Sequence, residues 1–226
     1  GSAGTQRQNI VIILLAGCLS MFFAEVFSGA SPLWFIDPWS LLVTYPLYMM
    51  HLIFFFNIAC GTNRMSIESL YLWGVIFGFY EFWITKVLWY GFFGQAPIFG
   101  RILGIAIFEF ALIALFWHPI MSFILPIAVI DILSRSQGYS HDVIHIDDAL
   151  ISKSMRNKIM GYYITINGAV ILAFNSGFNI LVTHLTVLGS ILIIILLAKR
   201  SPLERGLSGL VGGRRMTVSY THLRAH

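Results

Sequence analysis

The sequence has 226 residues, of which 58% are hydrophobic, 15% aromatic and only 11% charged, and its mean hydropathy is +0.81. A soluble domain carries roughly 25% charged residues, so this composition excludes a soluble protein and predicts one that crosses a membrane several times. The formal charge is +4, but it falls to +1 without the three arginines in the last thirteen positions, so no nucleic-acid partner is expected.

The first predicted spanning helix follows a short N-terminal segment. Residues 1–8 resemble a cloning scar or an N-terminal tail and stay outside the fold. Residues 9–27 form an apolar segment that is long enough, at 1.5 Å per residue, to cross a hydrocarbon core of about 30 Å. Residues 28–38 are rich in Gly, Pro, Ser and Asp, and this composition predicts a loop.

Two further spans are predicted at residues 40–59, interrupted by Pro46, and at residues 69–90. Residues 101–132 are too long for a simple crossing and contain Pro119, so they form either one long kinked helix or two short ones. With one crossing, nearly all lysines and arginines fall on one side of the membrane, as the positive-inside rule requires. We therefore favour one crossing.

The polar stretch 134–157 is predicted to be a solvated cytoplasmic loop. Its histidine–acid run is a weak candidate for a divalent-metal site, in which His141 and His145 lie one helical turn apart and Asp148 is the third ligand. No signature such as HExxH accompanies the run. We therefore interpret it as loop, and we expect no metal and no cofactor.

Two last spans at residues 158–174 and 178–198 complete an all-α, polytopic transmembrane helix bundle of about six spanning helices. Residues 9–200 are predicted to form a single domain, because no repeat or linker divides them. Residues 201–226 are predicted to be a tail, which resembles a translated sequencing adaptor from about residue 214. We expect the lipid bilayer of a prokaryotic plasma membrane to surround the domain, with both chain ends cytoplasmic; no oligomeric state is predicted.

Ionisable residues inside the spans are the candidate functional residues, because each costs about 3 kcal/mol or more at membrane depth. Counting along the third span places Glu81 about 18 Å from the cytoplasmic face, slightly beyond the midplane. His118 precedes a proline that frees a backbone carbonyl, and we predict Glu81 and His118 as the catalytic pair. A supporting polar layer is predicted from His51, Asn167, Lys86, Glu25, Glu109 and His184, although such polar contacts could instead only hold the helices together. Lys86 is expected to pair with Glu25 or Glu109 on a neighbouring helix, or to extend outward beside Trp89 and Tyr90.

The stretch YEFWITK at residues 80–86 resembles the EExxxR motif of the CAAX-protease and bacteriocin-processing family of intramembrane glutamic proteases. Glu81 matches the first acid of the motif and Lys86 matches its arginine. Phe82 stands in place of the second acid. The stretches AEVFSGASP, YEFWITK and FWHPIMSFILP also resemble uncharacterised multi-pass membrane proteins of archaea and bacteria, and that resemblance implies no activity.

The protease resemblance implies that a glutamate and a histidine activate water against a peptide bond. His118 and His184 would occupy the places of the histidines on the later helices, and Leu188 stands where the partner of the last histidine would be. A membrane-embedded peptide is then the expected substrate.

Three functions remain open from the sequence. A divergent intramembrane protease requires Glu81 and His118 within reach of one water molecule. A proton- or cation-coupled carrier of a small solute requires a solvent path past Glu81 to both faces. A non-enzymatic scaffold would pack Glu81 against Lys86 or Arg101 without a cavity.

Overall fold

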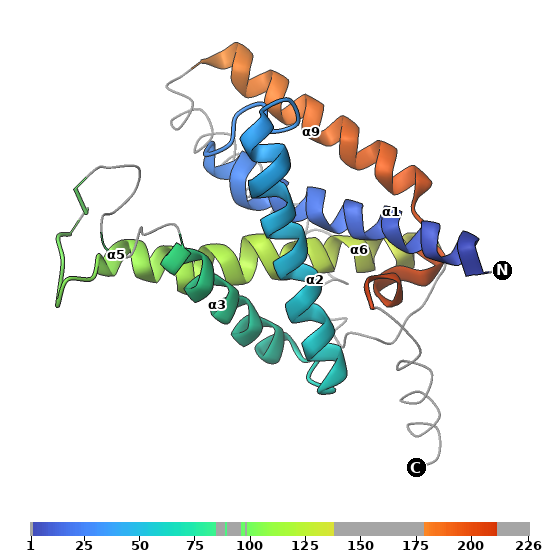
Figure 1. Cartoon of the computed structure of the whole chain (residues 1–226), viewed down its shortest axis with the longest axis horizontal. Coiled ribbons are helices and arrows are strands. Elements are labelled where there is room, and N and C mark those ends of the chain that lie inside the picture. Colours follow the sequence, from blue (N-terminus) through green and yellow to red (C-terminus); the bar gives the residue numbers. More distant parts are fainter. Residues whose placement is uncertain (1, 85–88, 90–95, 98, 138–178, 212–226) are drawn as a thin grey trace, which may run out of the picture.

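A computed structural model shows the chain as a bundle of crossing helices (Figure 1). The structure describes residues 2–84, 89, 96–97, 99–137 and 179–211. Its regular elements there are helical, apart from one isolated bridge, so the all-α prediction is confirmed. In chain order they are α1 (Ser2–Met21), η1 (Phe22–Val26), η2 (Ser40–Thr44), α2 (Tyr45–Gly61), α3 (Ile67–Ile84), α5 (Ile107–Phe110), η4 (Ala111–Ile124), α6 (Leu125–Ser136), α9 (Ile180–Arg200) and η5 (Leu203–Leu210).

Four described helices are long and apolar enough to cross a membrane: Asn9–Val26, Ser40–Gly61, Ile107–Arg135 and Ile180–Arg200. The third predicted span appears as α3, which is helical but is not among these four. The predicted span 158–174 lies outside the described residues, so the count of six stays a prediction.

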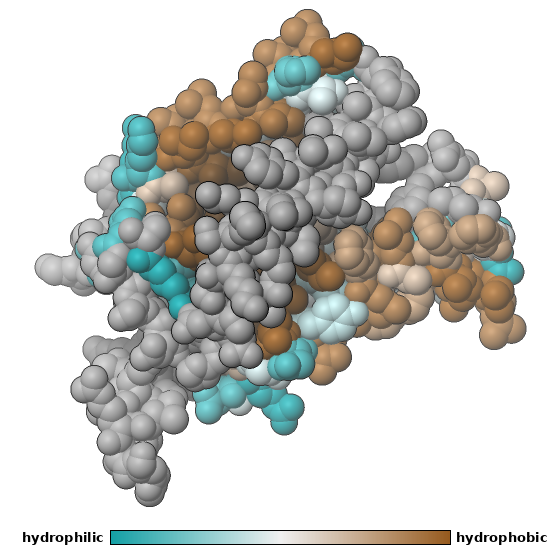
Figure 2. Space-filling view, turned by 180° about the vertical axis from the view of Figure 1, so that it is seen from behind, coloured by the Kyte–Doolittle hydropathy of each residue, from teal (hydrophilic) through white to brown (hydrophobic). Residues whose placement is uncertain are grey.

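The surface of the described helices is apolar, as lipid contact requires. On α9 the side chains of Leu188 and Leu192 are 62% and 57% exposed. Figure 2 shows apolar side chains over much of the described surface on one side of the molecule. A soluble monomer rarely exposes apolar patches of this extent, which supports the membrane assignment.

Prolines inside the spans are accommodated by wider, π-helical turns rather than by breaks. Proline lacks an amide hydrogen, and its ring clashes with the carbonyl four residues earlier. The π-helix η2 ends two residues before Pro46, and η4 contains Pro119. The predicted interruption at Pro46 is therefore wrong, because the helix is continuous over Ser40–Gly61.

A π-helical turn also keeps the long predicted helix continuous. From Ile107 to Arg135 the chain forms a single apolar helix through Pro119, in agreement with one crossing rather than two. The helix begins six residues later than the predicted start at residue 101. Before it, a tight turn pairs Ile102 with Ile105, and the turn residues Leu103 and Gly104 have φ of 54° and 82°.

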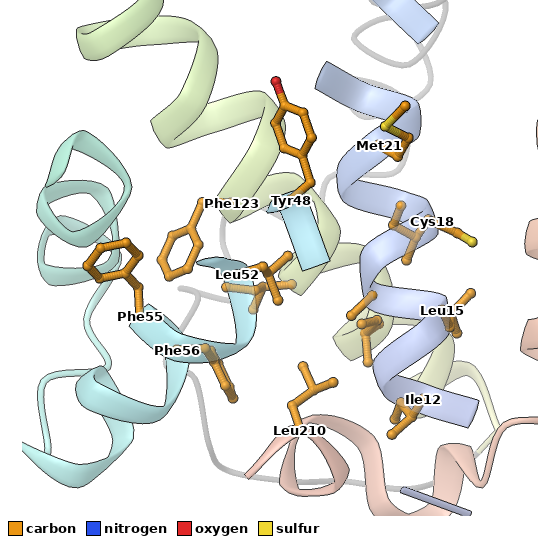
Figure 3. Packing of buried hydrophobic residues seen from close by; sticks show 14 of the residues in the cluster. Ile12, Leu15, Cys18, Met21, Tyr48, Leu52, Phe55, Phe56, Phe123 and Leu210 are labelled. Carbon is orange, nitrogen blue, oxygen red and sulfur yellow. The ribbon is translucent and has the colours of Figure 1, made fainter. Parts of the chain in front are cut away.

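The core lies where α1, α2, α6 and η5 meet. Figure 3 shows its buried side chains, with Leu15 on α1, Leu52 and Phe56 on α2, and Leu210 on η5 all no more than 1% exposed. Because lipid is as apolar as these side chains, their close packing rather than the exclusion of water holds the helices together.

The segment η5 lies within the predicted tail at residues 201–226 and packs against the bundle. The segment consists of two short 3₁₀ turns that meet at Gly206, where φ is 46°, and the structure buries Leu203, Leu207 and Leu210 in the core to 3% exposure or less. Ser134 Oγ donates to the Leu203 carbonyl at 2.6 Å, and Asn57 Nδ2 donates to the Leu210 carbonyl at 3.0 Å. The packed core therefore includes side chains beyond residue 200, as far as Val211.

Leu207→Ala is expected to lower the free energy of unfolding by about 2–5 kcal/mol, because it leaves a cavity beneath η5. Reversible unfolding in mixed detergent micelles measures the change. Leu192→Ala on the exposed face of α9 is the matched control and should change stability by less than about 0.5 kcal/mol. Equal effects of the two substitutions would mean that η5 is not packed against the bundle.

The loop after η1 docks on α9 through polar contacts. Trp34 Nε1 donates to Ser190 Oγ at 2.9 Å, and the Leu33 amide donates to Thr186 Oγ1 at 2.9 Å. Asp37 then caps the second span by accepting from the Ser40 amide at 2.7 Å. Hydrogen bonds from the Ser40 side chain and amide lower the pKa of the half-buried Asp37 carboxyl.

Candidate functional site

Two glycines allow α3 to lie directly against η4. A Cβ atom on Gly74 would stand 2.5 Å from the Pro119 Cα, and one on Gly78 would stand 2.9 Å from the Ala114 Cα. Side chains do not approach a backbone so closely, so this contact depends on both residues being glycine. Glu81 follows Gly78 by three residues on the same helix face, so the crossing aims it at η4.

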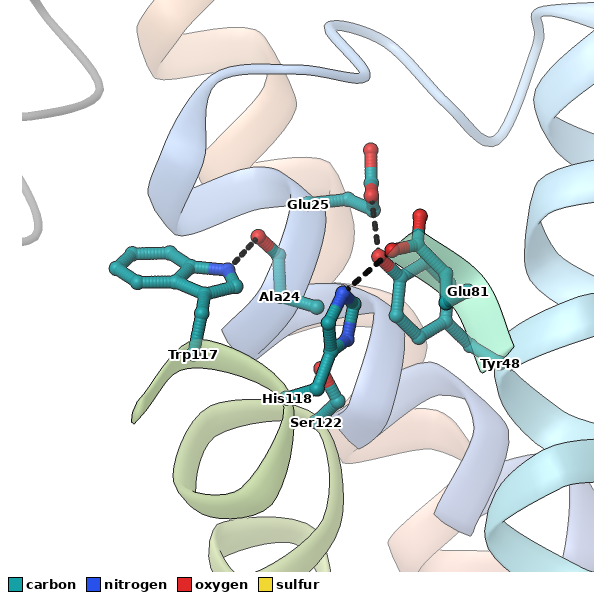
Figure 4. Close-up of polar contacts among 7 residues, drawn as sticks. All are labelled: Ala24, Glu25, Tyr48, Glu81, Trp117, His118 and Ser122. Atoms are coloured by element: carbon teal, nitrogen blue, oxygen red, sulfur yellow. Dashed lines mark hydrogen bonds and ion pairs between the residues drawn. The ribbon is translucent and has the colours of Figure 1, made fainter. Parts of the chain in front are cut away.

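The crossing brings Glu81 and His118 into direct contact. Glu81 Oε2 lies 2.7 Å from His118 Nε2 (Figure 4), and the two side chains are 12% and 3% exposed. The other ring nitrogen, Nδ1, lies 3.0 Å from Ser122 Oγ. With polar partners at both nitrogens, the imidazole is fixed in its plane.

Two aromatic rings pack against the imidazole ring of His118. The Tyr48 ring stacks on His118 with centroids 5.9 Å apart and planes at 27°, and the Phe77 ring lies at 5.0 Å. One turn before the histidine, the Leu115 carbonyl of η4 accepts a hydrogen bond from α3. Tyr71 Oη donates to that carbonyl at 2.7 Å, which joins α3 to η4 a second time.

A second carboxyl group, that of Glu25, points toward the same region (Figure 4). Tyr48 Oη donates to Glu25 Oε1 and Ser31 Oγ donates to Glu25 Oε2, both at 2.6 Å. Glu25 lies in the π-turn η1 at the end of α1, so four elements (η1, α2, α3 and η4) and a loop contribute to one polar cluster. We define the polar cluster as Glu25, Ser31, Tyr48, Glu81, His118 and Ser122.

This geometry supports acid–base chemistry. A carboxyl and an imidazole joined by one short hydrogen bond can exchange a proton between Oε2 and Nε2, so that either can act as acid or base. The low dielectric of the membrane interior strengthens their interaction. Within the described part of the chain, no group of three His, Cys, Asp or Glu side chains could hold a metal ion.

Other predicted site residues lie apart from this pair. His51 Nδ1 lies 2.7 Å from the Leu47 carbonyl, and its ring stacks on Phe77 at 5.1 Å. His184 is exposed on α9, with Nδ1 2.7 Å from the Ile180 carbonyl, and its place in the polar layer stays a prediction. Glu109 is buried, 1% exposed, at the start of the long helix.

Several predictions fall outside the described residues. These are the pairing of Lys86 with an acid, the position of Asn167, and the metal candidates His141, His145 and Asp148. Both carboxyl oxygens of Glu25, one of the two acids predicted to pair with Lys86, accept from hydroxyl groups.

Tyr48, Ser31 and Ser122 were not predicted from the sequence as parts of the site. Hydroxyl residues are common in membrane helices, and nothing in their spacing marks these three. The glycines did carry a signal, because Gly74 and Gly78 form a GxxxG pattern that is typical of close helix contacts.

A cavity of about 290 Å³ opens between α2 and α3, and none of its lining residues belongs to the polar cluster. His51, Phe54, Phe55 and Tyr80 line it, and Tyr80 directly precedes Glu81. Phe54 and Tyr80 are 59% and 52% exposed, so the cavity is open at the helix surface. An apolar group entering from the bilayer would fit this lining better than a charged solute.

Comparison with known proteins places the chain among membrane proteins of unknown activity. An uncharacterized protein of Archaeoglobus fulgidus is 39% identical over 129 residues, which cover 55% of this chain and 39% of the relative. The chain thus spans about two fifths of that relative's length. No solved structure matches the chain. Residues 14–218 match the model of an uncharacterized membrane protein family, and the chain belongs to that family.

Proposed function

We propose that this integral membrane protein is a membrane-embedded hydrolase of the glutamic-peptidase kind, with Glu81 and His118 as its acid–base pair. The observation that carries the proposal is the 2.7 Å contact between Glu81 Oε2 and His118 Nε2 in a nearly buried site. General acid–base catalysis requires groups within this distance of each other or of a shared water. The sequence resemblance of residues 80–86 supports the same reaction.

In the proposed reaction Glu81 takes the proton of an attacking water, and His118 passes a proton to the leaving amine. The bond to His118 uses Oε2, so Oε1 is the atom that would face the water. Glu81 is 12% exposed, four times the 3% of His118, which fits the carboxylate as the group nearest the substrate. The substrate class is a membrane-inserted peptide, whose apolar side chains suit the cavity beside Tyr80.

The proposal includes an orientation with both chain ends in the cytoplasm. Arg135 ends α6, Lys199 and Arg200 end α9, and Arg205 lies on η5. Ser134 and Leu203 are hydrogen-bonded, so these basic residues belong to one end of the bundle. A single basic end supports six crossings and the positive-inside arrangement in a prokaryotic plasma membrane.

A proton-coupled carrier is the second candidate. It is favoured by the direct contact of Glu81 with His118, which needs no intervening water to pass a proton. The long helix through Pro119 would then resemble the interrupted helices of transporters.

Reconstituting the full chain into lipid vesicles separates these functions. Mass spectrometry of membrane-inserted peptides reports cleavage, and a pH-sensitive dye inside the vesicles reports proton flux. Cleavage that needs the protein supports the hydrolase, whereas proton flux without cleavage replaces it by a carrier. If neither occurs, the polar cluster only forms hydrogen bonds that hold the helices together, and the protein is a scaffold.

A further inference from the structure

Glu25 is fixed more firmly than a lipid-facing acid would be. Besides the two hydroxyl groups on its carboxyl oxygens, its backbone carbonyl accepts from the Ala30 amide at 3.0 Å and from Ser28 Oγ at 3.1 Å. Ser31 is 8% exposed and Tyr48 is 3% exposed, so both hydroxyl groups are removed from bulk water. The surrounding loop and helix therefore hold this carboxyl group in one position.

Tyr48 connects Glu25 to the catalytic pair. Its hydroxyl bonds to Glu25, while the face of its ring stacks on His118. Glu81 and His118 both interact electrostatically with the Glu25 carboxyl. Among the described residues, the groups that face it are Ser31 from the loop, Tyr48 from α2, Glu81 from α3 and His118 from η4.

The charge of this cluster limits its protonation. If Glu25 and Glu81 were both ionised and His118 were protonated, a net charge of −1 would remain in the membrane interior, where an unbalanced charge is costly. One more proton makes the cluster neutral. Because Glu81 is already paired with His118, Glu25 is the group left to receive that proton.

We propose that Glu25 holds the second proton of the site as a neutral carboxylic acid, while Glu81 and His118 form an ion pair and Tyr48 positions the His118 ring. A protonated Glu25 donates to the hydroxyl oxygen of Tyr48 or Ser31, either of which can accept. No bond other than O–H and N–H bonds changes when the proton moves. This inference rests on the acid–base role proposed for Glu81 and His118.

Infrared spectroscopy of the full-length protein in lipid vesicles at neutral pH tests the inference without any substrate. The carbonyl stretch of a protonated carboxyl group should be present in the unaltered protein. Glu25→Gln should remove the intensity of one carboxyl group. Glu68→Gln, which changes an exposed acid at the start of α3, should leave the band of the protonated carboxyl group unchanged.

Tyr48→Phe keeps the ring stacked on His118 but removes the hydroxyl group. It should shift the Glu25 band, because one hydrogen bond is lost, without abolishing it. A band that survives Glu25→Gln unchanged, or the absence of any such band, would overturn the inference. A failure to cleave peptides would instead count against the hydrolase alone, because the band is recorded without turnover.

Discussion

Glu81→Gln is expected to slow peptide cleavage by about 10²–10⁴-fold, the usual contribution of a positioned acid or base. Glutamine has nearly the same shape as glutamate, so α3 should still pack on η4. The amide group can also donate to or accept from His118. What is lost is the ability to take a proton from water. Rates measured under single turnover in vesicles report this loss directly.

Glu68→Gln is the matched control, because it makes the same chemical change on the same helix at an exposed position. It should leave the cleavage rate unaltered. Combining Glu81→Gln with His118→Gln should be hardly worse than Glu81→Gln alone, because groups that act as a unit are not additive. A Glu81→Gln variant that cleaves at the normal rate would remove Glu81 from the mechanism.

The pairing of Glu81 with His118 shows how far depth along a helix can guide prediction. Counting residues from a helix end estimates how deep a side chain lies, and both residues were selected because they lie inside apolar spans. Depth does not say which way a side chain points around its helix. For this reason His184, chosen on the same grounds, instead lies on the exposed face of α9.

Pairing between spans was harder to predict than the spans themselves. Helix geometry points Lys86 away from Glu81 and predicts Glu25 or Glu109 as its partner. Lys86 lies outside the described residues, and the structure gives Glu25 the hydroxyl groups of Ser31 and Tyr48. Hydroxyl partners leave no pattern in the sequence, because their choice depends on how the helices cross. Likewise, Pro46 predicts that the backbone hydrogen bonds of the helix are interrupted. It does not predict the wider π-helical turn in η2, which lets the helix continue through the proline.

The crossing of α3 and η4 leads to the second large effect. Gly78→Ala would place a methyl group 2.9 Å from the Ala114 Cα and 3.3 Å from the His118 Cβ. Both neighbours are held by the backbone of η4, so the helices must move apart. Overpacking of this kind lowers the free energy of unfolding by about 1–3 kcal/mol.

The same movement should separate Glu81 from His118. A displacement of about 1 Å can cost a factor of 10² in rate, so Gly78→Ala should reduce cleavage about 10²-fold even in protein that remains folded. Gly74→Ala lies farther from Glu81 but meets the Pro119 Cα at 2.5 Å. It should therefore destabilise the protein at least as much as Gly78→Ala. Unfolding in mixed micelles and single-turnover rates measure the two effects separately.

Gly61→Ala provides the control, because a methyl group at this position on α2 meets no atom within 4 Å. It should be neutral or stabilise the protein slightly, since alanine favours a helix more than glycine does. If Gly78→Ala behaves like Gly61→Ala in both measurements, the close crossing does not set the distance between Glu81 and His118. If stability falls while the cleavage rate holds, the crossing supports the fold alone and the pair is positioned by other contacts, such as the bond from Tyr71 to the Leu115 carbonyl.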